Sequence, residues 1–368
     1  MIRVWSYLRQ YEEEKKHIHE AIEKVFRSGR LILGKSVENF EKEFANYCKL
    51  KYGVGVNSGT DALFIALKTL DIGPGDEVIT VPNTAIPTVS AICSTGATPV
   101  FVDVNPDTFL IQPNQIESRI TNKTKCILPV HLYGQCCDMD LIQKIAKRHN
   151  LHIIEDCAQS QGALWKNKIS GSMSTISAFS FYPTKILGAY GDAGMVATNS
   201  EEYSKKARML RMYGMKNEEY YSHIQGYNTR LDEVQAEILR FKLTRIDRYI
   251  KKRQEIAARY HKGLKDTPLG LPKINRGSSH AYYLFVCKHE KRDKIIDYME
   301  ENDVMLNVSY KYPIHLMTAY KFLGYHEGDF PVAEAACRQI FSLPMYPELT
   351  ADEQDLVIAK LKQYMKLI

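Results

Sequence analysis

The sequence predicts an α/β protein: a large domain with a mostly parallel seven-stranded sheet, followed by a smaller C-terminal α+β domain. Short β-rich runs alternate with helical patterns through the first two-thirds of the 368 residues, and the pattern then changes. Such alternation is typical of a parallel sheet covered on both faces. We therefore expect ligands to bind beyond the carboxyl ends of the strands.

Seven runs are predicted to form this sheet. In chain order they are Y-G-V-G-V at 52–56, E-V-I-T-V at 77–81, T-P-V-F-V-D-V at 98–104, K-C-I-L-P-V at 125–130, H-I-I-E-D at 152–156, I-S-A-F-S-F at 176–181 and G-M-V-A-T-N at 194–199. Helical patterns such as D-A-L-F-I-A-L-K-T-L and D-L-I-Q-K-I-A-K-R-H lie between them.

The last third has a different pattern. One long amphipathic helix is predicted over about 230–262, because its apolar residues recur at steps of three and four. A strand (A-Y-Y-L-F-V-C), a helix (K-I-I-D-Y-M-E-E-N) and two helices around 331–341 and 351–366 follow. We place the large domain at 1–245 and the small domain at 246–368.

Composition excludes several classes of protein. With 45% apolar and 25% charged residues the chain is typical of globular proteins, and it contains no apolar run long enough for a membrane span. The N-terminus does not resemble a signal peptide, so we expect a cytoplasmic protein. The net charge of +6 is not gathered into a nucleic-acid-binding stripe. The eight cysteines lack C-x-x-C spacing, so we expect reduced thiols and no metal.

Lys185 is the first candidate for chemistry. It lies in A-F-S-F-Y-P-T-K-I-L-G-A-Y-G-D-A-G, where a strand ends near Ser180 and the chain turns through Pro183. This turn places the lysine just past the edge of the sheet, among small residues. Partial desolvation there makes an amine a better nucleophile. The alternative is a solvated surface lysine, as most lysines are.

The segment L-H-I-I-E-D-C-A-Q-S supplies a possible partner for a heterocyclic ring. Asp156 ends an apolar run, where a buried carboxylate needs a cation, and a protonated pyridine nitrogen is one. Ala158 is small enough to lie against a flat ring, and Gln159 is placed to reach a ring oxygen. Taken alone, Asp156 is equally well explained as a helix N-cap.

The segment G-V-G-V-N-S-G-T-D-A-L predicts a phosphate site. A strand stops at Asn57 and a helix begins near Thr60, so the unpaired N–H groups of the first turn face outward at Gly59 and Thr60. A plain N-cap turn explains the same residues. With Lys185 and Asp156, however, they complete a set of phosphate cradle, ring-nitrogen partner and aldehyde-binding amine.

Five ordered segments carry a family resemblance. N-S-G-T-D-A-L, E-D-C-A-Q-S, S-F-Y-P-T-K-I-L-G-A-Y-G-D-A-G, G-Y-N-T-R-L-D-E-V-Q-A and G-D-F-P-V-A-E resemble the DegT/DnrJ/EryC1/StrS sugar aminotransferases, which are fold-type I pyridoxal phosphate enzymes. The resemblance covers about residues 10–365. It implies pyridoxal 5′-phosphate as cofactor and a homodimer whose active sites lie at the subunit interface.

The resemblance also implies roles for single residues. Lys185 corresponds to the lysine that bonds the cofactor aldehyde, Asp156 to the partner of the ring nitrogen and Gln159 to the partner of the ring oxygen. The phosphate ligands correspond to Gly59, Thr60, Ser180 and, from the other subunit, Asn228. Without the resemblance, Asn228 is best explained as a turn residue before the predicted long helix.

Two positions depart from the family pattern. Many relatives carry an aromatic residue that stacks on the cofactor ring, and in P-N-T-A-I-P-T-V this chain has Ala85 instead. The stretch K-Y-P-I-H-L-M-T-A-Y is read as shorter than the usual Y-P-x-P-x-H-L-Q pattern, so no substrate role is assigned to His315. Lys185 is present where relatives with histidine are dehydratases, which favours transamination.

The implied reaction moves an amino group from L-glutamate to a nucleotide-linked keto sugar. N-T-R-L-D-E-V-Q-A and the upstream L-R-M-Y-G resemble members that act on C3 of a dTDP-3-keto-6-deoxyhexose, giving a dTDP-3-amino-3,6-dideoxyhexose. Two alternatives stay open: a C4 aminotransferase of a dTDP- or UDP-4-keto-6-deoxyhexose, and a non-catalytic regulatory protein that binds the cofactor. A dinucleotide-binding oxidoreductase is excluded, because no G-x-G-x-x-G follows a strand.

Overall fold

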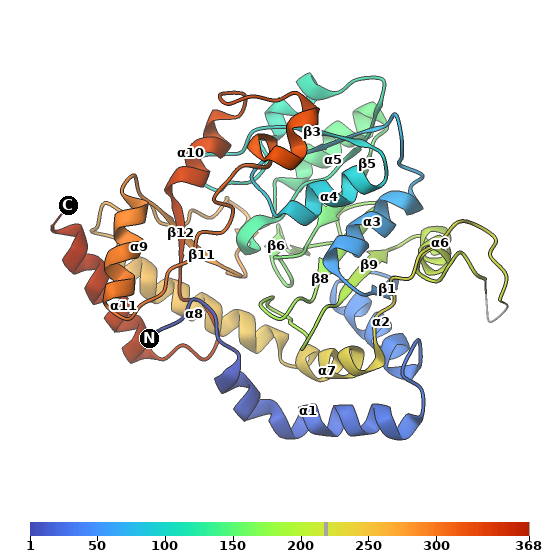
Figure 1. Cartoon of the computed structure of the whole chain (residues 1–368), viewed down its shortest axis with the longest axis horizontal. Coiled ribbons are helices and arrows are strands. Elements are labelled where there is room, and N and C mark those ends of the chain that lie inside the picture. Colours follow the sequence, from blue (N-terminus) through green and yellow to red (C-terminus); the bar gives the residue numbers. More distant parts are fainter. Residues whose placement is uncertain (217–219, 368) are drawn as a thin grey trace.

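The computed structural model describes residues 1–216 and 220–367. Its centre is a seven-stranded sheet in the order β1-β9-β8-β5-β4-β2-β3 (Figure 1). The strands are β1 (Tyr52–Val56), β2 (Glu77–Thr80), β3 (Thr98–Phe101), β4 (Thr124–Ile127), β5 (His152–Asp156), β8 (Ile176–Ser180) and β9 (Gly194–Thr198). β9 runs antiparallel to β1 and β8, and the remaining pairs are parallel. The predicted α/β class and its mostly parallel sheet are confirmed.

Helices cover the sheet. They are α2 (Lys35–Tyr47), α3 (Gly59–Thr69), α4 (Ile86–Ser94), α5 (Met139–His149) and α6 (Glu201–Arg211), whereas α1 (Leu8–Ser28) packs against α7 (Glu233–Leu243). α3 is apolar on most sides because it packs on β8 and β9 and also against α4 and α6. This burial fixes the start of α3 beside the end of β8. Among the described residues, none of the helices combines the length and apolar character that a membrane crossing requires.

The prediction of one long helix is wrong, because the segment forms two helices. α7 (Glu233–Leu243) and α8 (Ile246–Leu264) are separated by Thr244 and Arg245. The Thr244 hydroxyl donates to the carbonyl oxygen of Phe241 at 2.7 Å, and the Thr244 backbone N–H donates to the same oxygen at 3.1 Å. Such local bonds compete with the helical ladder and interrupt it. Apolar periodicity continues through the break, so the sequence pattern did not show it.

The C-terminal part has the predicted α+β character. It contains β11 (Phe285–Lys288) paired antiparallel with β12 (Ile340–Leu343), and the helices α8, α9 (Arg292–Glu301), α10 (Pro331–Gln339) and α11 (Ala351–Met365). A second hydrophobic cluster there includes Tyr260, Phe285, Phe341 and also Ile2 from the N-terminus. Three short strands, β6 (Leu164–Trp165), β7 (Lys168–Ile169) and β10 (Ser278–Ser279), form a separate small sheet. The boundary between residues 245 and 246 remains a prediction.

Candidate active site

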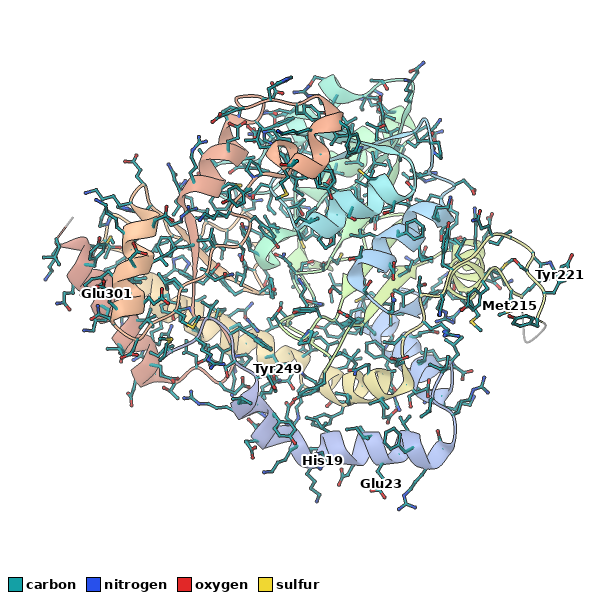
Figure 2. The ribbon with its side chains drawn as sticks, in the orientation of Figure 1. His19, Glu23, Met215, Tyr221, Tyr249 and Glu301 are labelled. Atoms are coloured by element: carbon teal, nitrogen blue, oxygen red, sulfur yellow. The ribbon has the colours of Figure 1, made fainter. Side chains whose placement is uncertain are left out.

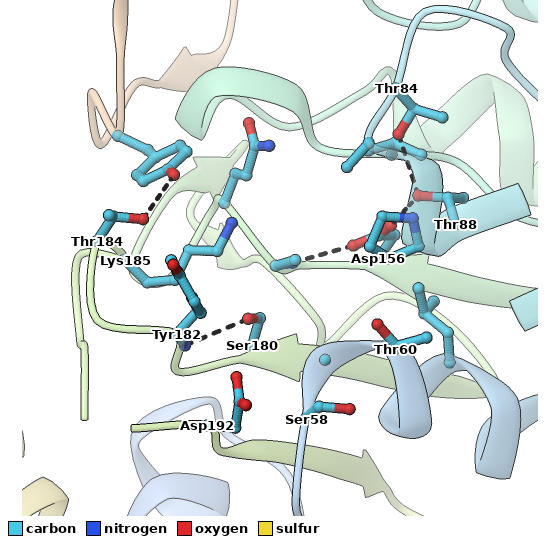
Figure 3. A pocket seen from close by; sticks show the side chains of 18 of the residues that line it. Ser58, Thr60, Thr84, Thr88, Asp156, Ser180, Tyr182, Thr184, Lys185 and Asp192 are labelled. Atoms are coloured by element: carbon cyan, nitrogen blue, oxygen red, sulfur yellow. Dashed lines mark hydrogen bonds between the residues drawn. The ribbon is translucent and has the colours of Figure 1, made fainter. Parts of the chain in front are cut away.

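One cavity of about 320 Å³ lies at the carboxyl ends of β5 and β8 and at the N-terminus of α3 (Figure 3). This is the edge at which the sequence predicted ligand binding. Six of the seven predicted cofactor-binding residues line the cavity: Gly59, Thr60, Asp156, Gln159, Ser180 and Lys185. The N-terminus of α3 and the ends of β5 and β8 are far apart in the sequence. The strand order of the sheet brings them together at this edge.

The N-terminus of α3 forms one end of the cavity. Ser58 caps the helix, since its hydroxyl accepts the N–H of Asp61 at 3.1 Å. The N–H groups of Gly59 and Thr60 have no acceptor among the described residues. A Cβ on Gly59 would lie 2.5 Å from the Cβ of Ser180, so only glycine lets α3 begin this close to β8. Free N–H groups, the helix dipole and a nearby hydroxyl together suit an anion such as phosphate.

Asp156 lies in the floor of the cavity with only 3% of its surface exposed. One carboxylate oxygen accepts the N–H of Ala158 at 3.1 Å, and the other accepts the hydroxyl of Thr88 at 2.9 Å. Burial raises the pKa of the Asp156 carboxyl, while these two bonds and the charge of Lys185 oppose the rise. A buried carboxylate with this balance binds a cationic ligand group favourably.

Gln159 is held from both ends of its amide. Its Oε1 accepts the backbone N–H of Tyr133 at 2.7 Å, and its Nε2 donates to the hydroxyl of Tyr310. Tyr133 has a positive φ of 62°. One hydrogen on Nε2 is not used by Tyr310 and can donate to a ligand. Gln159 therefore presents a donor, which suits a negatively charged oxygen.

Lys185 lies in the turn after β8. Its backbone N–H donates to the carbonyl of Tyr182 at 2.8 Å, which closes the turn. Its Nζ lies 4.5 Å from the centre of the Tyr283 ring, and the Tyr283 hydroxyl is 3.0 Å from that of Thr184. A Cβ on Gly188 would lie 2.4 Å from the carbonyl oxygen of Pro183, so the turn depends on glycine there. The lysine amine thus faces Asp156 across the cavity (Figure 3).

Three residues that line the cavity or bond its lining residues were not found from the sequence. Thr88 bonds Asp156, Tyr310 bonds Gln159, and Tyr283 lies over the Lys185 amine. Thr88 follows Ala85 by three positions on α4, so the helical period was a usable signal for it. Tyr310 and Tyr283 come from the C-terminal third, and only the packing of that part against the sheet brings them here.

A buried cluster elsewhere has metal-ligand residue types. His131, Glu155 and Cys157 offer atoms close enough together to hold an ion. Their polar atoms are already used: His131 Nδ1 accepts the N–H of Cys137, and its Nε2 lies 2.8 Å from Glu155. Glu155 also accepts the N–H groups of Gly171 and Met173. The cluster therefore links the loops behind β5 as a hydrogen-bonded network.

Comparison with known protein families shows to which family the chain belongs. The model of the DegT/DnrJ/EryC1/StrS aminotransferase family matches residues 12–362. The chain belongs to this family. The predicted family and the predicted aminotransferase class are confirmed.

Several relatives are similar over nearly the whole chain. A dTDP-3-amino-3,4,6-trideoxy-alpha-D-glucose transaminase of Micromonospora megalomicea subsp. nigra is 49% identical and covers 98% of each chain. A pleiotropic regulatory protein of Geobacillus stearothermophilus is 44% identical over 97% of this chain and 96% of its own.

Solved structures show the same likeness. DesV of S. venezuelae, in complex with a ketimine intermediate, has a TM-score of 0.98 at 40% identity, covering 100% of this chain and 99% of its own. NtdA of Bacillus subtilis with bound cofactor PMP has a TM-score of 0.89 at 33% identity, covering 96% and 82%.

The remaining family-based residues lie in different surroundings. Asn228 is exposed and is not among the described residues that line the cavity of its own chain. Ala85 lines the cavity with a small side chain. His315 is 1% exposed, with Nε2 3.1 Å from Glu334 and its ring against Phe330. It packs behind the site and is not among the described lining residues.

Proposed function

We propose that this enzyme transfers an amino group from L-glutamate to C3 of a dTDP-linked 3-keto-6-deoxyhexose, with pyridoxal phosphate held on Lys185. The single observation that carries the proposal is the cavity. It places a lysine amine, a buried carboxylate and a helix N-terminus with free N–H groups around one space of suitable size. Those three groups match the aldehyde, the ring nitrogen and the phosphate of the cofactor.

The donor set fits pyridoxal phosphate at each end. Gly59 lets the N-terminus of α3 lie close to Ser180, since a Cβ there would lie 2.5 Å from the Ser180 Cβ, so the first-turn N–H groups and the Ser180 hydroxyl border the same end of the cavity. The Asp156 carboxylate can accept a hydrogen bond from a protonated ring nitrogen, and the Gln159 amide can donate one to a ring oxygen. Ala158 and Ala85 line the cavity with small side chains, which suits a flat ring. The bound form of NtdA supports the same cofactor.

The cofactor supplies an electron sink that makes the Cα–H bond of the bound amino acid acidic. Two of the protein's own residues would then act. With the cofactor bound, the Lys185 amine would be the base that takes the proton from Cα of the amino acid and, once protonated, the acid that gives it back. Asp156 keeps the ring nitrogen protonated, and its two fixed hydrogen bonds keep the carboxylate aimed at it. The second half-reaction runs the same proton transfers in reverse on the keto sugar.

The choice of C3 is supported by the Micromonospora relative, which is named as the transaminase of a dTDP-linked 3-amino sugar. The high structural similarity to DesV over the whole chain supports a similarly shaped cavity. A C4 aminotransferase is the alternative within the class. The cytoplasm is the proposed compartment, since all eight cysteines are free thiols, as in reducing surroundings.

A homodimer with shared sites is part of the proposal. Asn228 is exposed on a strand-like segment that pairs with Met212, so it is accessible to a second copy. α1 runs along the edge of the molecule, where Figure 2 shows His19 and Glu23. Phe26, on α1, is 62% exposed, and Leu31, which follows the helix, is 53% exposed. Apolar side chains gathered in this way favour burial against another protein surface.

The test uses purified protein with pyridoxal phosphate, L-glutamate and synthetic dTDP-linked 3-keto and 4-keto sugars. We expect glutamate to convert the bound cofactor to its amine form, seen as loss of visible absorbance. The 3-keto sugar should then restore the absorbance and yield a 3-amino product by NMR. Borohydride reduction and peptide mapping should label Lys185. Turnover of the 4-keto sugar alone, or a label on another lysine, contradicts the proposal.

A regulatory protein is the second candidate, because the Geobacillus relative carries a regulatory name. The complete set of Lys185, Asp156 and Gln159 in one cavity favours an enzyme. The same glutamate experiment separates the two, since a protein that only binds the cofactor leaves its visible absorbance unchanged.

A further inference from the structure

A second lysine, Lys242 on α7, contacts the turn that carries Lys185. It is 4% exposed, and its Nζ donates to the carbonyl oxygen of Gly188 at 2.6 Å. The same Nζ lies 5.1 Å from the centre of the Tyr190 ring. Gly188 and Tyr190 belong to the loop between β8 and β9, a few residues after Lys185.

This loop is a compact turn with one side free of the sheet. Its ends are tied by the bond from the Ala189 N–H to the Phe181 carbonyl at 2.8 Å. The free side faces α7, which holds it at two points. Gln235, two turns before Lys242, bonds both the N–H and the carbonyl of Tyr190, at 2.9 and 3.3 Å. Lys242 provides the second attachment, at Gly188.

The ammonium group of Lys242 is buried, and removing a charged group from water costs free energy. Burial lowers the pKa of Lys242 to about 8, although Glu14 and Glu348 oppose the fall through space. Glu14 has its own partners, the Tyr249 hydroxyl and Arg245 at 3.4 Å, so it does not fully neutralise Lys242. In return, a charge-assisted hydrogen bond is about twice as strong as a neutral one. The bond to Gly188 is therefore a firm attachment.

We propose that Lys242 is a positioning residue, which fixes the Tyr182–Tyr190 turn so that the Lys185 amine points into the cavity. The turn carries Lys185 near its middle, and on the α7 side it is held by Gln235 at Tyr190 and by Lys242 at Gly188. A displacement of about 1 Å at a reacting group is enough to slow a reaction strongly. The inference rests on the proposed function only in that Lys185 is the residue that bonds the cofactor.

The test replaces Lys242 by Met, which has similar length but neither charge nor N–H. Two measurements follow: hydrogen–deuterium exchange of the peptide covering 182–191 in the cofactor-free protein, and the rate at which added pyridoxal phosphate gains visible absorbance. We expect Lys242→Met to speed exchange in that peptide about tenfold and to slow cofactor capture about tenfold, because the turn opens more often. The first measurement does not depend on the proposed cofactor or reaction.

The matched control is Arg292→Met. Arg292 is equally buried, at 4% exposed, and donates to the carbonyl of Cys337 away from the loop. It should lose stability without loosening peptide 182–191. If Lys242→Met does not fold, Lys242→Gln replaces it, keeping a neutral donor on a shorter side chain. The proposal is overturned if, in Lys242→Met, exchange of peptide 182–191 is no faster and cofactor capture is no slower than in Arg292→Met. Lys242 would then be a structural residue only.

Discussion

At the scale of single residues, Asp156 combines a stability cost with a proposed functional gain. Burial raises its pKa, so the native cofactor-free chain keeps this proton to higher pH than the unfolded chain does. Its contribution to stability is therefore present below pH of about 3.8 and is lost as the pH rises through the raised native value. At neutral pH the buried carboxylate costs stability until a cation binds beside it.

We predict that Asp156→Asn raises the melting temperature of the cofactor-free protein at pH 8 by about 2 °C, a gain of roughly 1 kcal/mol. The same change should slow turnover by at least about a hundredfold, because the ring nitrogen loses its charged partner. Asp103→Asn is the control, since Asp103 accepts N–H groups of Val104, Val332 and Ala333 and should lower the melting temperature when neutralised. A lower melting temperature for Asp156→Asn would refute the argument.

Gly59 gives a second prediction at this scale. Gly59→Ala places a Cβ 2.5 Å from that of Ser180, so it should push apart the two sides of the phosphate site and weaken cofactor binding about tenfold or more. Fluorescence or absorbance titration with pyridoxal phosphate measures this. Gly73→Ala serves as control, because its Cβ would meet nothing closer than 3.6 Å. Equal affinities in the two variants would show that the phosphate binds elsewhere.

At the scale of elements, α7 also supports α2. Glu233, in the first turn of α7, accepts the N–H groups of Gly34, Ser36 and Val37 at 2.8 to 2.9 Å. These are orphan donors at the start of α2, whose own N-cap residue is glycine. We predict that Glu233→Gln lowers the free energy of unfolding by about 2 kcal/mol in urea titrations. Exposed Glu38→Gln, in the same helix start, should change it by less than about 0.5 kcal/mol.

Comparison of the predicted and observed elements shows which features of the fold could be predicted from the sequence. All seven strands of the main sheet were found, because buried parallel strands read as short apolar runs. The break at Thr244 was missed, since a side-chain hydrogen bond to Phe241 interrupts the helix without interrupting its apolar period. Local motifs located Lys185, Asp156 and the α3 N-terminus, but Tyr310 and Tyr283 reach the cavity only through tertiary packing.

At the scale of the whole molecule, the proposed dimer predicts complementation between defective chains. Lys185→Ala damages the site of its own chain, whereas Asn228→Ala should damage the site of its partner. In a mixed dimer both lesions then fall on one site, so activity should recover to about half the normal value per mixed dimer, as two-fold symmetry requires. Mixing Lys185→Ala with Asp156→Asn is the control and should give no recovery. No recovery in the first mixture, with subunit exchange verified, means that Asn228 serves its own chain.

The position of α7 has a consequence for how the two sites communicate. The helix begins five residues after Asn228, which is proposed to face the other subunit's phosphate site. Its first turn holds the loop of its own Lys185 through Gln235, and its last turn does so through Lys242. In a shared-site dimer, α7 would therefore be connected to elements of both cofactor sites. We expect filling of one site to shift the binding equilibrium of the other, by an equal amount in both directions because linkage is reciprocal. Cofactor uptake by the dimer should therefore be cooperative, with a Hill coefficient that differs from one.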